Sequence, residues 1–436
     1  MSTRSRELII LLIAGTIGAT AFASAWIAQR GAVDYGWAVW ALLLAALFLV
    51  AHAVARVVVP FADPTLLPVA ALITSVGLTF VYRVDPADAR KQIVWVAIGV
   101  GVFAAVLLLL RFDYRVLERY KYSFGVTAIA LLMLPSVPHL GARINGAKLW
   151  VHVGPLQFQP GEIAKIFLVI FLAGYLRDKR ESLAVGRLKD LGPLLAIWGA
   201  AMLVLVQTGD LGPALLNFGI FLAMLYIATG RAMYVLVGLG LFAAGSTVLY
   251  HTLGRVHQRV TVWLQPWTDH RVYCSVTGKL DFRQNCDAYQ LVKSLYSIAN
   301  GGYGGTGIGK GTFETVDGTQ LIPLLQTDFI YSAIAQEVGL VGSAAVLLLF
   351  LVFVARGMRV AMLAQDGFSK LLAAGLTFGF ALQTFIIVGG VLRVVPLTGI
   401  TLPFVSYGGS SILANFALLA LLMLVSNRAV ATAGGT

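Results

Sequence analysis

Long runs of apolar residues recur along this chain and constrain its fold more than any other feature. Each run lasts about twenty residues, the length that an α-helix needs to cross the hydrocarbon core of a bilayer. The runs are continuous and do not alternate between apolar and polar residues, so they predict helices and not the strands of a membrane barrel. We therefore expect an all-α, polytopic membrane protein with about twelve transmembrane helices. The expected spans are residues 8–28, 36–57, 66–82, 92–110, 121–138, 162–177, 191–206, 211–229, 232–250, 338–357, 368–391 and 405–426.

The composition supports the membrane class and bears on the choice of partners. Of the 436 residues, 58% are hydrophobic and only 12% are charged, whereas a soluble domain carries about 25% charged residues. The net charge of +12 would ordinarily suggest nucleic-acid binding. Membrane topology explains it better, because the basic residues gather in the loops on one side of the expected spans. We expect a membrane environment and no nucleic-acid partner.

The expected number of spans is even, which places both termini on the same side of the membrane. The short loops and chain ends on that side are rich in Lys and Arg, whereas the short loops opposite contain fewer of them. By the positive-inside rule, both termini are cytoplasmic. The long polar segment 251–326 is then extracytoplasmic, together with segments 139–160 and 393–404.

Segment 251–326 contains both cysteines of the chain, Cys274 and Cys286. An extracytoplasmic location permits oxidation, so their spacing predicts a disulfide. Closing so short a loop contributes on the order of 3 kcal/mol. A metal pair is less favoured, because no further Cys and no closely spaced His completes a ligand set.

The same segment offers charged side chains next to an aromatic run that suits the membrane surface. Arg255 and Arg259 lie one helical turn apart and suit a phosphate or pyrophosphate, either of a substrate or of ordinary lipid headgroups. Asp269 follows the run VWLQPWT, where a carboxylate is placed to deprotonate a substrate hydroxyl. Asp281 and Asp287 are the alternatives in the same segment.

Charged residues also occur at the expected membrane boundary. Pro160 is suited to the first position of a helix, which places Glu162 in the first turn and Lys165 three residues further on the same face. Charges at this depth are costly and usually functional, although a mutually neutralising pair that only packs the bundle is the alternative. Asp210, in the turn QTGDLGP, either caps the following helix or points into a polar cavity.

The run ANGGYGGTGIGKGT resembles nucleotide-binding motifs only in its glycine spacing. Gly311 stands where the P-loop requires Ser or Thr to hold a metal, and no strand–turn–helix unit surrounds the run. We therefore expect a backbone turn that approaches an anionic group, or a flexible loop.

Two further motifs flank the last spans. TDFIYSAIAQEVGLVG places Asp328 at an expected helix N-cap, and Glu337 nine residues later. PLTGITLPFVSYGGSSILAN contains Ser406, Ser410 and Ser411 among Pro and Gly residues. A broken, polar helix start at membrane depth is tolerated only where it lines a cavity or is buried in protein.

Five motifs, in this order, resemble the SEDS family (shape, elongation, division and sporulation), the RodA/FtsW group. They are QPGEIAK, the DLG turn, YQLVKSLYSIANGGYGGTGIGKG, TDFIYSAIAQEVGLVG and PLTGITLPFVSYGGSS, and the resemblance extends over about residues 63–428. It implies a core of about ten helices in residues 63–436, preceded by an extra N-terminal transmembrane pair in residues 1–62. It slightly favours a RodA-like member.

The resemblance implies a peptidoglycan glycosyltransferase of the bacterial cytoplasmic membrane. Such an enzyme polymerises lipid II at the outer face of the membrane by inverting β-1,4 glycosyl transfer, in cell elongation or division, and releases undecaprenyl pyrophosphate. A class B penicillin-binding protein is the implied transpeptidase partner. No cofactor is certain; a divalent metal, Mg²⁺ or Mn²⁺, is one candidate beside Arg255, Arg259 and Lys165 for neutralising the leaving group.

The resemblance also assigns roles to individual residues. The run WLQPWTD places the family's essential aspartate at Asp269. His270 stands where the family usually has Pro, and the cysteine-bearing insert enlarges the spacing to Tyr289, so Asp281 and Asp287 remain alternatives. The expected substrate-binding residues are Arg255, Arg259, Glu162, Lys165, Asp210, Gln290, Ser294, Asp328, Glu337, Ser406, Ser410 and Ser411.

Two other functional classes fit parts of the pattern. A lipid II flippase also needs many spans and intramembrane charges such as Glu162 and Lys165. Against it, the sequence shows no inverted repeat, and its distinctive residues crowd at the outer face instead of the midplane. A non-catalytic scaffold for cell-wall enzymes is the third class, and it leaves the intramembrane charges without a purpose.

Overall fold

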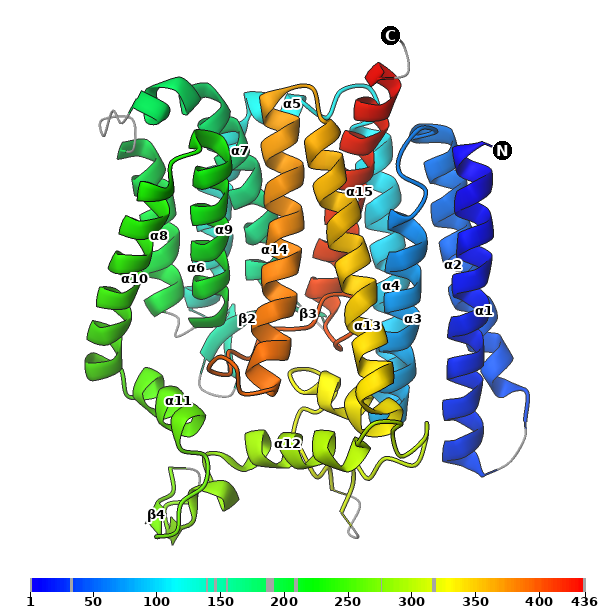
Figure 1. Cartoon of the computed structure of the whole chain (residues 1–436), viewed down its shortest axis with the longest axis vertical. Coiled ribbons are helices and arrows are strands. Elements are labelled where there is room, and N and C mark those ends of the chain that lie inside the picture. Colours follow the sequence, from blue (N-terminus) through cyan, green and yellow to red (C-terminus); the bar gives the residue numbers. More distant parts are fainter. Residues whose placement is uncertain are drawn as a thin grey trace.

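The computed structural model describes residues 2–31, 34–138, 140–144, 147–153, 156–185, 192–207, 211–275, 277–315 and 319–433. Long helices run side by side in a bundle, with two shorter helices across one end (Figure 1). The helices are α1 Thr3–Arg30, α2 Gly36–Val58, α3 Leu66–Val84, α4 Pro86–Leu109, α5 Val116–Arg119, α6 Lys121–Met133, α7 Pro160–Val185, α8 Gly192–Gln207, α9 Leu211–Thr229, α10 Ala232–Thr252, α11 Gly254–Leu264, α12 Tyr289–Gly301, α13 Ile330–Leu363, α14 Gly367–Val391 and α15 Gly409–Ala433.

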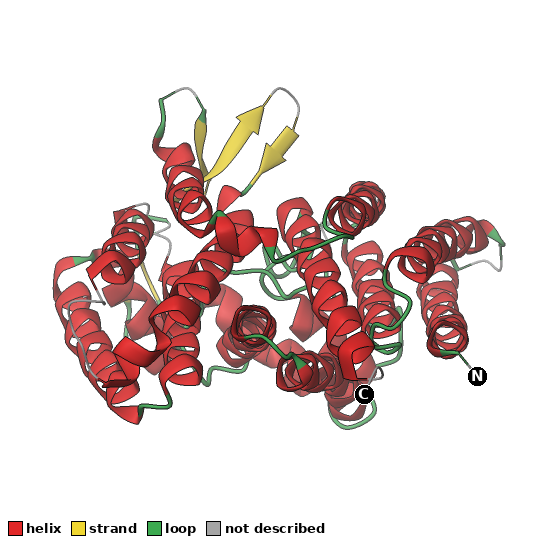
Figure 2. Cartoon of the chain, turned by 90° about the horizontal axis from the view of Figure 1, so that it is seen from above, coloured by secondary structure: helices red, strands yellow, loops and turns green. Residues whose placement is uncertain are grey.

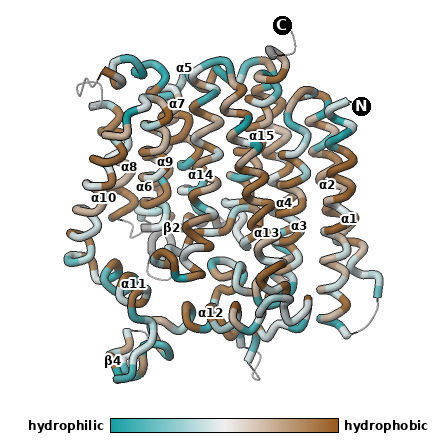
Figure 3. The backbone as a smooth tube through the Cα atoms, in the orientation of Figure 1, coloured by the Kyte–Doolittle hydropathy of each residue, from teal (hydrophilic) through white to brown (hydrophobic). Residues whose placement is uncertain are grey.

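Each expected span contains a helix, and the all-α membrane class is confirmed. Within the described residues, nine helices are long and apolar enough to cross a membrane. The helices α6, α7 and α8 are not among the nine, so the number twelve stays a prediction. Hydrophobic residues cover the middle of the bundle and hydrophilic residues gather at its ends (Figure 3). Both termini lie at the same end, and α11 and α12 lie at the opposite end (Figure 1).

Burial identifies the centre of the bundle. In the most apolar stretch of each helix, 83% of the residues of α3, 78% of those of α14 and 83% of those of α15 are buried. In α10 only 6% are buried. The three central helices therefore pack against protein on most sides, and α10 stands at the edge. Polar groups at the ends of α14 and α15 are consequently surrounded by packed protein.

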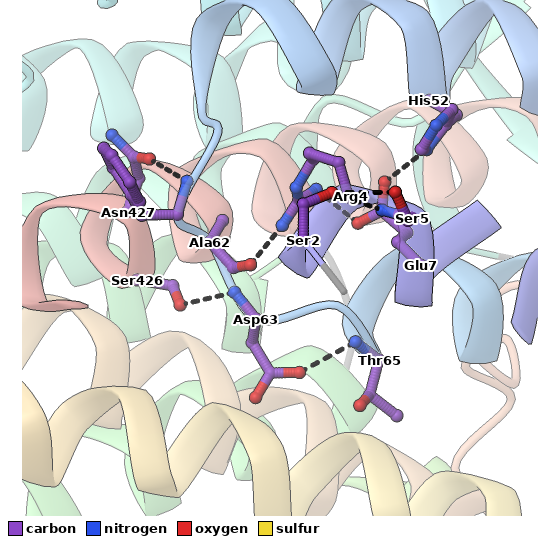
Figure 4. Close-up of polar contacts among 11 residues, drawn as sticks. Ser2, Arg4, Ser5, Glu7, His52, Ala62, Asp63, Thr65, Ser426 and Asn427 are labelled. Carbon is purple, nitrogen blue, oxygen red and sulfur yellow. Dashed lines mark hydrogen bonds and ion pairs between the residues drawn. The ribbon is translucent and has the colours of Figure 1, made fainter. Parts of the chain in front are cut away.

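A buried polar cluster joins the two N-terminal helices. Arg4 of α1 binds the Glu7 carboxylate and the carbonyl of Ala62, and His52 Nδ1 of α2 lies 2.7 Å from Glu7 Oε1 (Figure 4). Each charge has a partner, as burial requires. The cluster therefore connects α1, α2 and the loop that leads into α3.

That loop is also bound to the end of α15. The backbone N–H groups of Phe61 and Asp63 donate to Asn427 Oδ1 and Ser426 Oγ at 2.8 and 2.9 Å. The N-terminal pair thus contacts the rest of the bundle through polar groups (Figure 4), and its apolar residues join the main hydrophobic core. The division between residues 1–62 and 63–436 stays a prediction.

Segment 139–160 forms strands where a turn-rich or re-entrant segment was expected. The strands β1 Gly141–Ile144, β2 Ala147–Val153 and β3 Leu156–Phe158 pair antiparallel in the order β1-β2-β3, at one edge of the bundle (Figure 2). The run LWVHV is rich in β-branched and aromatic residues, which favour a strand. A second, smaller pair consists of β4 Val272–Tyr273 and β5 Leu280–Asp281.

The glycine-rich run packs on a break in α13, where Gly339 has φ 68°. The N–H of Leu340 donates to the Gly302 carbonyl at 2.9 Å, and the N–H of Thr306 donates to the Gln336 carbonyl at 2.9 Å. The run therefore satisfies backbone groups that the break leaves without a helical partner. Its glycines are needed for this close backbone approach.

Candidate active site

A buried ion pair lies at the start of α7, which begins at Pro160 as expected. Lys165 Nζ is 2.9 Å from Glu162 Oε2, and the two side chains are 8% and 9% exposed. Lys165 also donates to Gln383 Oε1 of α14 at 2.6 Å, and Gln383 Nε2 donates to the Thr401 carbonyl at 2.9 Å. A buried pair is stable only when further hydrogen bonds satisfy its charges. Gln383 supplies one of them and connects the pair to the segment before α15.

The start of α15 continues this network. Thr401 Oγ1 donates to Ser411 Oγ at 2.8 Å, and Ser410 Oγ accepts from the N–H of Gln159 at 2.7 Å. Both serines are buried. The polar helix start is therefore buried in protein, one of the two situations that the sequence allowed.

Ser406 connects the same segment to the start of α13. Its hydroxyl donates to the Thr327 carbonyl at 2.5 Å and accepts from the N–H of Leu402 at 2.9 Å. Gln92 of α4 donates to the Ser406 carbonyl at 3.1 Å. The structure thus brings Glu162, Lys165, Ser406, Ser410 and Ser411 into one polar region near the start of α7, the last turns of α14 and the start of α15.

Asp328 adjoins this region but does not cap α13, so the expected N-cap is wrong. The helix begins at Ile330, and Phe329 occupies the cap position without a side-chain bond. Asp328 instead lies close to Gly399, as Arg259 does: a Cβ added to Gly399 would lie 3.4 Å from Asp328 Oδ2 and 4.0 Å from Arg259 Nη2. Burial raises the pKa of the Asp328 carboxyl to about 6, although a hydrogen bond with Thr327 and the Arg259 guanidinium oppose the shift.

Helix α11 carries Arg255 and Arg259 and is held by the segment after α14. Arg393 Nε donates to the Trp263 carbonyl at 2.7 Å, and Trp263 Nε1 donates to the Arg393 carbonyl at 3.1 Å. Arg259 Nη1 donates to the Thr398 carbonyl at 3.1 Å. Arg259 is half-buried and Arg255 is exposed. The two arginines therefore lie on a fixed surface helix beside Asp328.

Glu337 binds Arg83 and the glycine-rich run. Its Oε1 accepts from Arg83 Nε at 2.9 Å and from the N–H of Gly311 at 3.1 Å, and its Oε2 accepts from the N–H of Gly309 at 2.9 Å. Arg83 Nη2 also donates to the carbonyls of both glycines. Glu337 and Arg83 together fix the glycine-rich run, and a role for Glu337 in substrate binding stays a prediction.

Asp269 has a different setting, in a segment that extends beyond the end of the bundle (Figure 1). Its side chain is fully exposed, and Asp269 Oδ1 is 3.0 Å from His270 Nδ1. This hydrogen bond lowers the pKa of the Asp269 carboxyl. Asp281 accepts from the N–H of Phe282 at 2.7 Å, and Asp287 accepts from Ser275 Oγ at 2.6 Å. Of the three carboxylates, Asp269 is the most accessible to a substrate.

Two expected site residues lie apart from these contacts, and a third lies outside the described residues. Gln290 Nε2 donates to the Pro323 carbonyl at 3.0 Å, and Ser294 is completely buried in α12. Among the described residues, neither side chain hydrogen-bonds the Glu162–Lys165 pair or Asp269. Asp210 lies outside the residues that the structure describes.

The sequence reasoning missed Gln383, Gln92, Thr401 and Arg393. Gln383 and Gln92 are amides within or at the start of otherwise apolar spans, and polar side chains at membrane depth are rare and commonly functional. That signal was available for both glutamines. Thr401 and Arg393 lie in a loop, where nothing in the local pattern sets them apart.

The disulfide removes the two cysteines from the set of possible metal ligands. Cys274, Cys286 and Asp287 are the group of metal-ligating side chains that converges in the described part of the chain, but the two cysteines are joined by a disulfide with a Cα–Cα distance of 5.8 Å. Mg²⁺ and Mn²⁺ also prefer oxygen ligands. This group therefore does not fit a site for either ion.

Comparison with known proteins agrees with this architecture. The family model for FtsW, RodA and SpoVE, described as "Cell cycle protein", matches residues 37–430. The peptidoglycan glycosyltransferase RodA of Mycobacterium tuberculosis is 40% identical, over 98% of this chain and 91% of its own length.

Solved structures are similar as well. One chain from a study of how a peptidoglycan synthase complex coordinates polymerization and crosslinking superposes with a TM-score of 0.67 at 27% identity, and the match covers 84% of this chain and 98% of that one. The rod shape determining protein RodA of Thermus thermophilus superposes with a TM-score of 0.60 at 26% identity, with 84% and 96% covered.

Proposed function

The chain belongs to the FtsW/RodA/SpoVE family of peptidoglycan glycosyltransferases, and we propose that it polymerises lipid II with Asp269 as its general base. One observation carries the assignment to this region. Helix α11, which carries the two arginines, and the segment with the exposed Asp269 that follows it lie at the end of the bundle opposite the termini, and α7, with its buried Glu162–Lys165 pair, begins directly after β3, in the half of the bundle nearer that end (Figure 1). A lipid-linked sugar fits such an end, because its isoprenoid lies in the bilayer while its sugars lie at the surface.

The proposed reaction is a single displacement. The Asp269 carboxylate accepts the proton of the acceptor GlcNAc 4-hydroxyl, and that oxygen attacks the anomeric carbon of the donor sugar. The bond from this carbon to the pyrophosphate oxygen breaks, and undecaprenyl pyrophosphate leaves with the electron pair. An α-linked donor gives a β-1,4 product, so the reaction inverts configuration and needs no covalent sugar–enzyme intermediate, in parallel with inverting glycosidases.

The leaving pyrophosphate gains negative charge in the transition state and needs nearby cations. We assign this role to Arg255 and Arg259, because α11 presents them one turn apart on a helix anchored by Arg393. Arginine binds phosphate oxygens with a planar fork of donors. Lys165 is connected through Gln383 to the Thr401 carbonyl, in the same segment whose Thr398 carbonyl binds Arg259. A divalent ion stays a proposal without assigned residues.

We propose that the protein resides in the bacterial cytoplasmic membrane with both termini in the cytoplasm. The Lys and Arg distribution and the common location of the two termini support this orientation. We also propose a class B penicillin-binding protein as partner. The likeness to a chain of a complex that couples polymerization with crosslinking supports that choice.

The test is polymerisation of purified lipid II by the purified protein, alone and with a co-purified transpeptidase. We expect glycan strands from the wild type and from Asp281→Asn and Asp287→Asn, and none from folded Asp269→Asn. Glycan from Asp269→Asn together with its loss in either control would move the base to that control residue. No glycan from the wild type with its partner would favour the flippase.

A further inference from the structure

The residue before Asp269 is held by a single amide side chain. The N–H of Thr268 donates to Gln284 Oε1 at 3.0 Å, and Gln284 Nε2 donates to the Thr268 carbonyl at 3.2 Å. Gln284 therefore occupies both backbone groups of Thr268, as a hydrogen-bonded pair in a neighbouring strand would. The N–H of Arg283 adds a third bond, to Thr268 Oγ1 at 3.1 Å.

The contacts with Thr268 come from the cysteine-bearing insert, residues 272–287, of which the structure describes 272–275 and 277–287. Arg283 and Gln284 lie in the 3₁₀ turn Arg283–Asn285, and Cys286 follows it directly. The Cys274–Cys286 disulfide ties this turn to the other end of the hairpin formed by β4 and β5. The disulfide thus restrains the turn that carries Gln284.

The insert is in turn connected to α11, the helix that carries Arg255 and Arg259. Gln258 Nε2 of α11 donates to Ser275 Oγ at 2.9 Å, and Ser275 donates to Asp287 Oδ1 at 2.6 Å. Arg283 Nη1 also donates to the carbonyl of Gln265, just after α11, at 2.7 Å. Contacts therefore run from α11 through the insert and back to the peptide next to Asp269.

We propose that the insert 272–287 is a disulfide-closed positioning element for Asp269, and that Gln284 is its positioning residue. This inference rests on the proposed function of Asp269. The Asp269 side chain is fully exposed and is hydrogen-bonded to His270, the adjacent residue, so its own contacts fix it weakly. A catalytic group must be held within about 0.5 Å of its productive geometry. Holding the Thr268 peptide provides that restraint without covering the carboxylate.

The element makes activity depend on an oxidised disulfide. A dithiol reductant gives two electrons and two protons to the Cys274–Cys286 bond, which yields two thiols, and the dithiol becomes a cyclic disulfide. The turn that carries Gln284 is then free to move away from Thr268. An extracytoplasmic location keeps the bond oxidised under ordinary conditions.

The first test replaces Gln284 in the full-length protein and measures lipid II polymerisation. We expect Gln284→Met to lower kcat about 10- to 100-fold, the effect of misplacing a reacting group by about 1 Å, while KM changes less than about twofold. Gln284→Glu keeps an acceptor for the Thr268 N–H but loses the donor, so its kcat lies in between. Gln320→Met, in the same extracytoplasmic segment, is the matched control and keeps wild-type kcat.

Hydrogen exchange provides a readout that does not depend on activity. We expect the Thr268 amide to exchange faster in Gln284→Met than in the wild type, at an unchanged thermal midpoint. Unchanged kcat, or a fall in the thermal midpoint in step with kcat, would overturn the positioning role. Asp269→Asn separates the two proposals: if it stays active the proposed base is wrong, and if it is inactive while Gln284→Met is fully active only the positioning role fails.

A second test examines the disulfide. We expect dithiothreitol to lower the kcat of the wild type to the level of the Cys274→Ser/Cys286→Ser variant, and to leave that variant unchanged. Adding Gln284→Met to the double serine variant should cause little further loss, because both changes release the same peptide. Additive losses would show that the disulfide and Gln284 act separately and would overturn the proposal.

Discussion

Two aspartates at the same end of the bundle have opposite surroundings. Asp269 is fully exposed, and a hydrogen bond with His270 lowers its pKa. Asp328 is partly buried near Arg259, and burial raises its pKa to about 6. A general base works best with a pKa near the working pH, which favours Asp328, whereas access to a sugar hydroxyl favours Asp269.

The comparison shows that accessibility and a shifted pKa are separate requirements, met here by different residues. Asp328 owes its high pKa to the burial that limits its access to a substrate. Asp269 is open to substrate, and a bound sugar that displaces water would raise its pKa at the moment of reaction. We therefore assign the chemistry to Asp269 and a structural and electrostatic role beside Arg259 to Asp328.

Replacing each aspartate by asparagine tests this division most strongly. We expect Asp269→Asn to reduce lipid II polymerisation about 10³-fold, within the range that a general base contributes, with an unchanged thermal midpoint. Asp328→Asn should retain activity within about tenfold. The measurement is the initial rate of glycan formation in detergent. The reverse order of losses would assign the base to Asp328.

Glu162 is a third carboxylate to compare with the two aspartates. It is buried, and the Lys165 ammonium lies at hydrogen-bond distance from it. Lys165→Met leaves Glu162 buried without its charge partner, so we expect a loss of about 3–5 kcal/mol in the free energy of unfolding. Adding Glu162→Gln should recover most of that loss, because it removes the uncompensated charge. Denaturant titration of both variants in detergent measures the effect. An equally unstable double variant would contradict this account of the pair.

The pH dependence of stability distinguishes the two aspartates more finely. The folded pKa of Asp328 is about 6, against 3.8 for the ordinary carboxyl, so the folded protein binds more protons than the unfolded chain between these values. Stability should therefore fall as pH rises from about 4 through 6, by at most about 3 kcal/mol. Thermal unfolding from pH 4 to 8 measures this. The slope should become shallower in Asp328→Asn and stay as steep in Asp269→Asn.

Replacing His270 should have the smallest effect on the polymerisation rate. Its hydrogen bond lowers the pKa of Asp269, so His270→Ala should move the acidic limb of the kcat profile to higher pH. The rate at neutral pH should change little, because Asp269 stays ionised there in both forms. Rate measurements across the acidic range provide the check. A profile that does not move would show that another group controls the limb.

Several features were predictable because they depend on neighbours in the chain. The apolar spans, the Pro160 start of α7 and the Glu162–Lys165 contact follow from local hydropathy and helical spacing. The strands of segment 139–160 were missed, because a short apolar run does not by itself distinguish a strand from a turn-rich interfacial segment. The expected Asp328 cap was wrong, because α13 begins one residue later than a cap at that position requires.

The sequence by itself determined the membrane class, the positions of the long apolar helices and the family, since each rests on composition or on contiguous motifs. Only the tertiary structure decided which polar groups meet. Lys165 and Gln383 are 218 positions apart, and Arg83 and Glu337 are 254 apart. Local pattern carries no information about such partners, because they are chosen by helix packing and by the cost of leaving a buried polar group unpaired. The same cost explains why the glycine-rich run closes the break in α13 and why Gln284 binds the peptide beside Asp269.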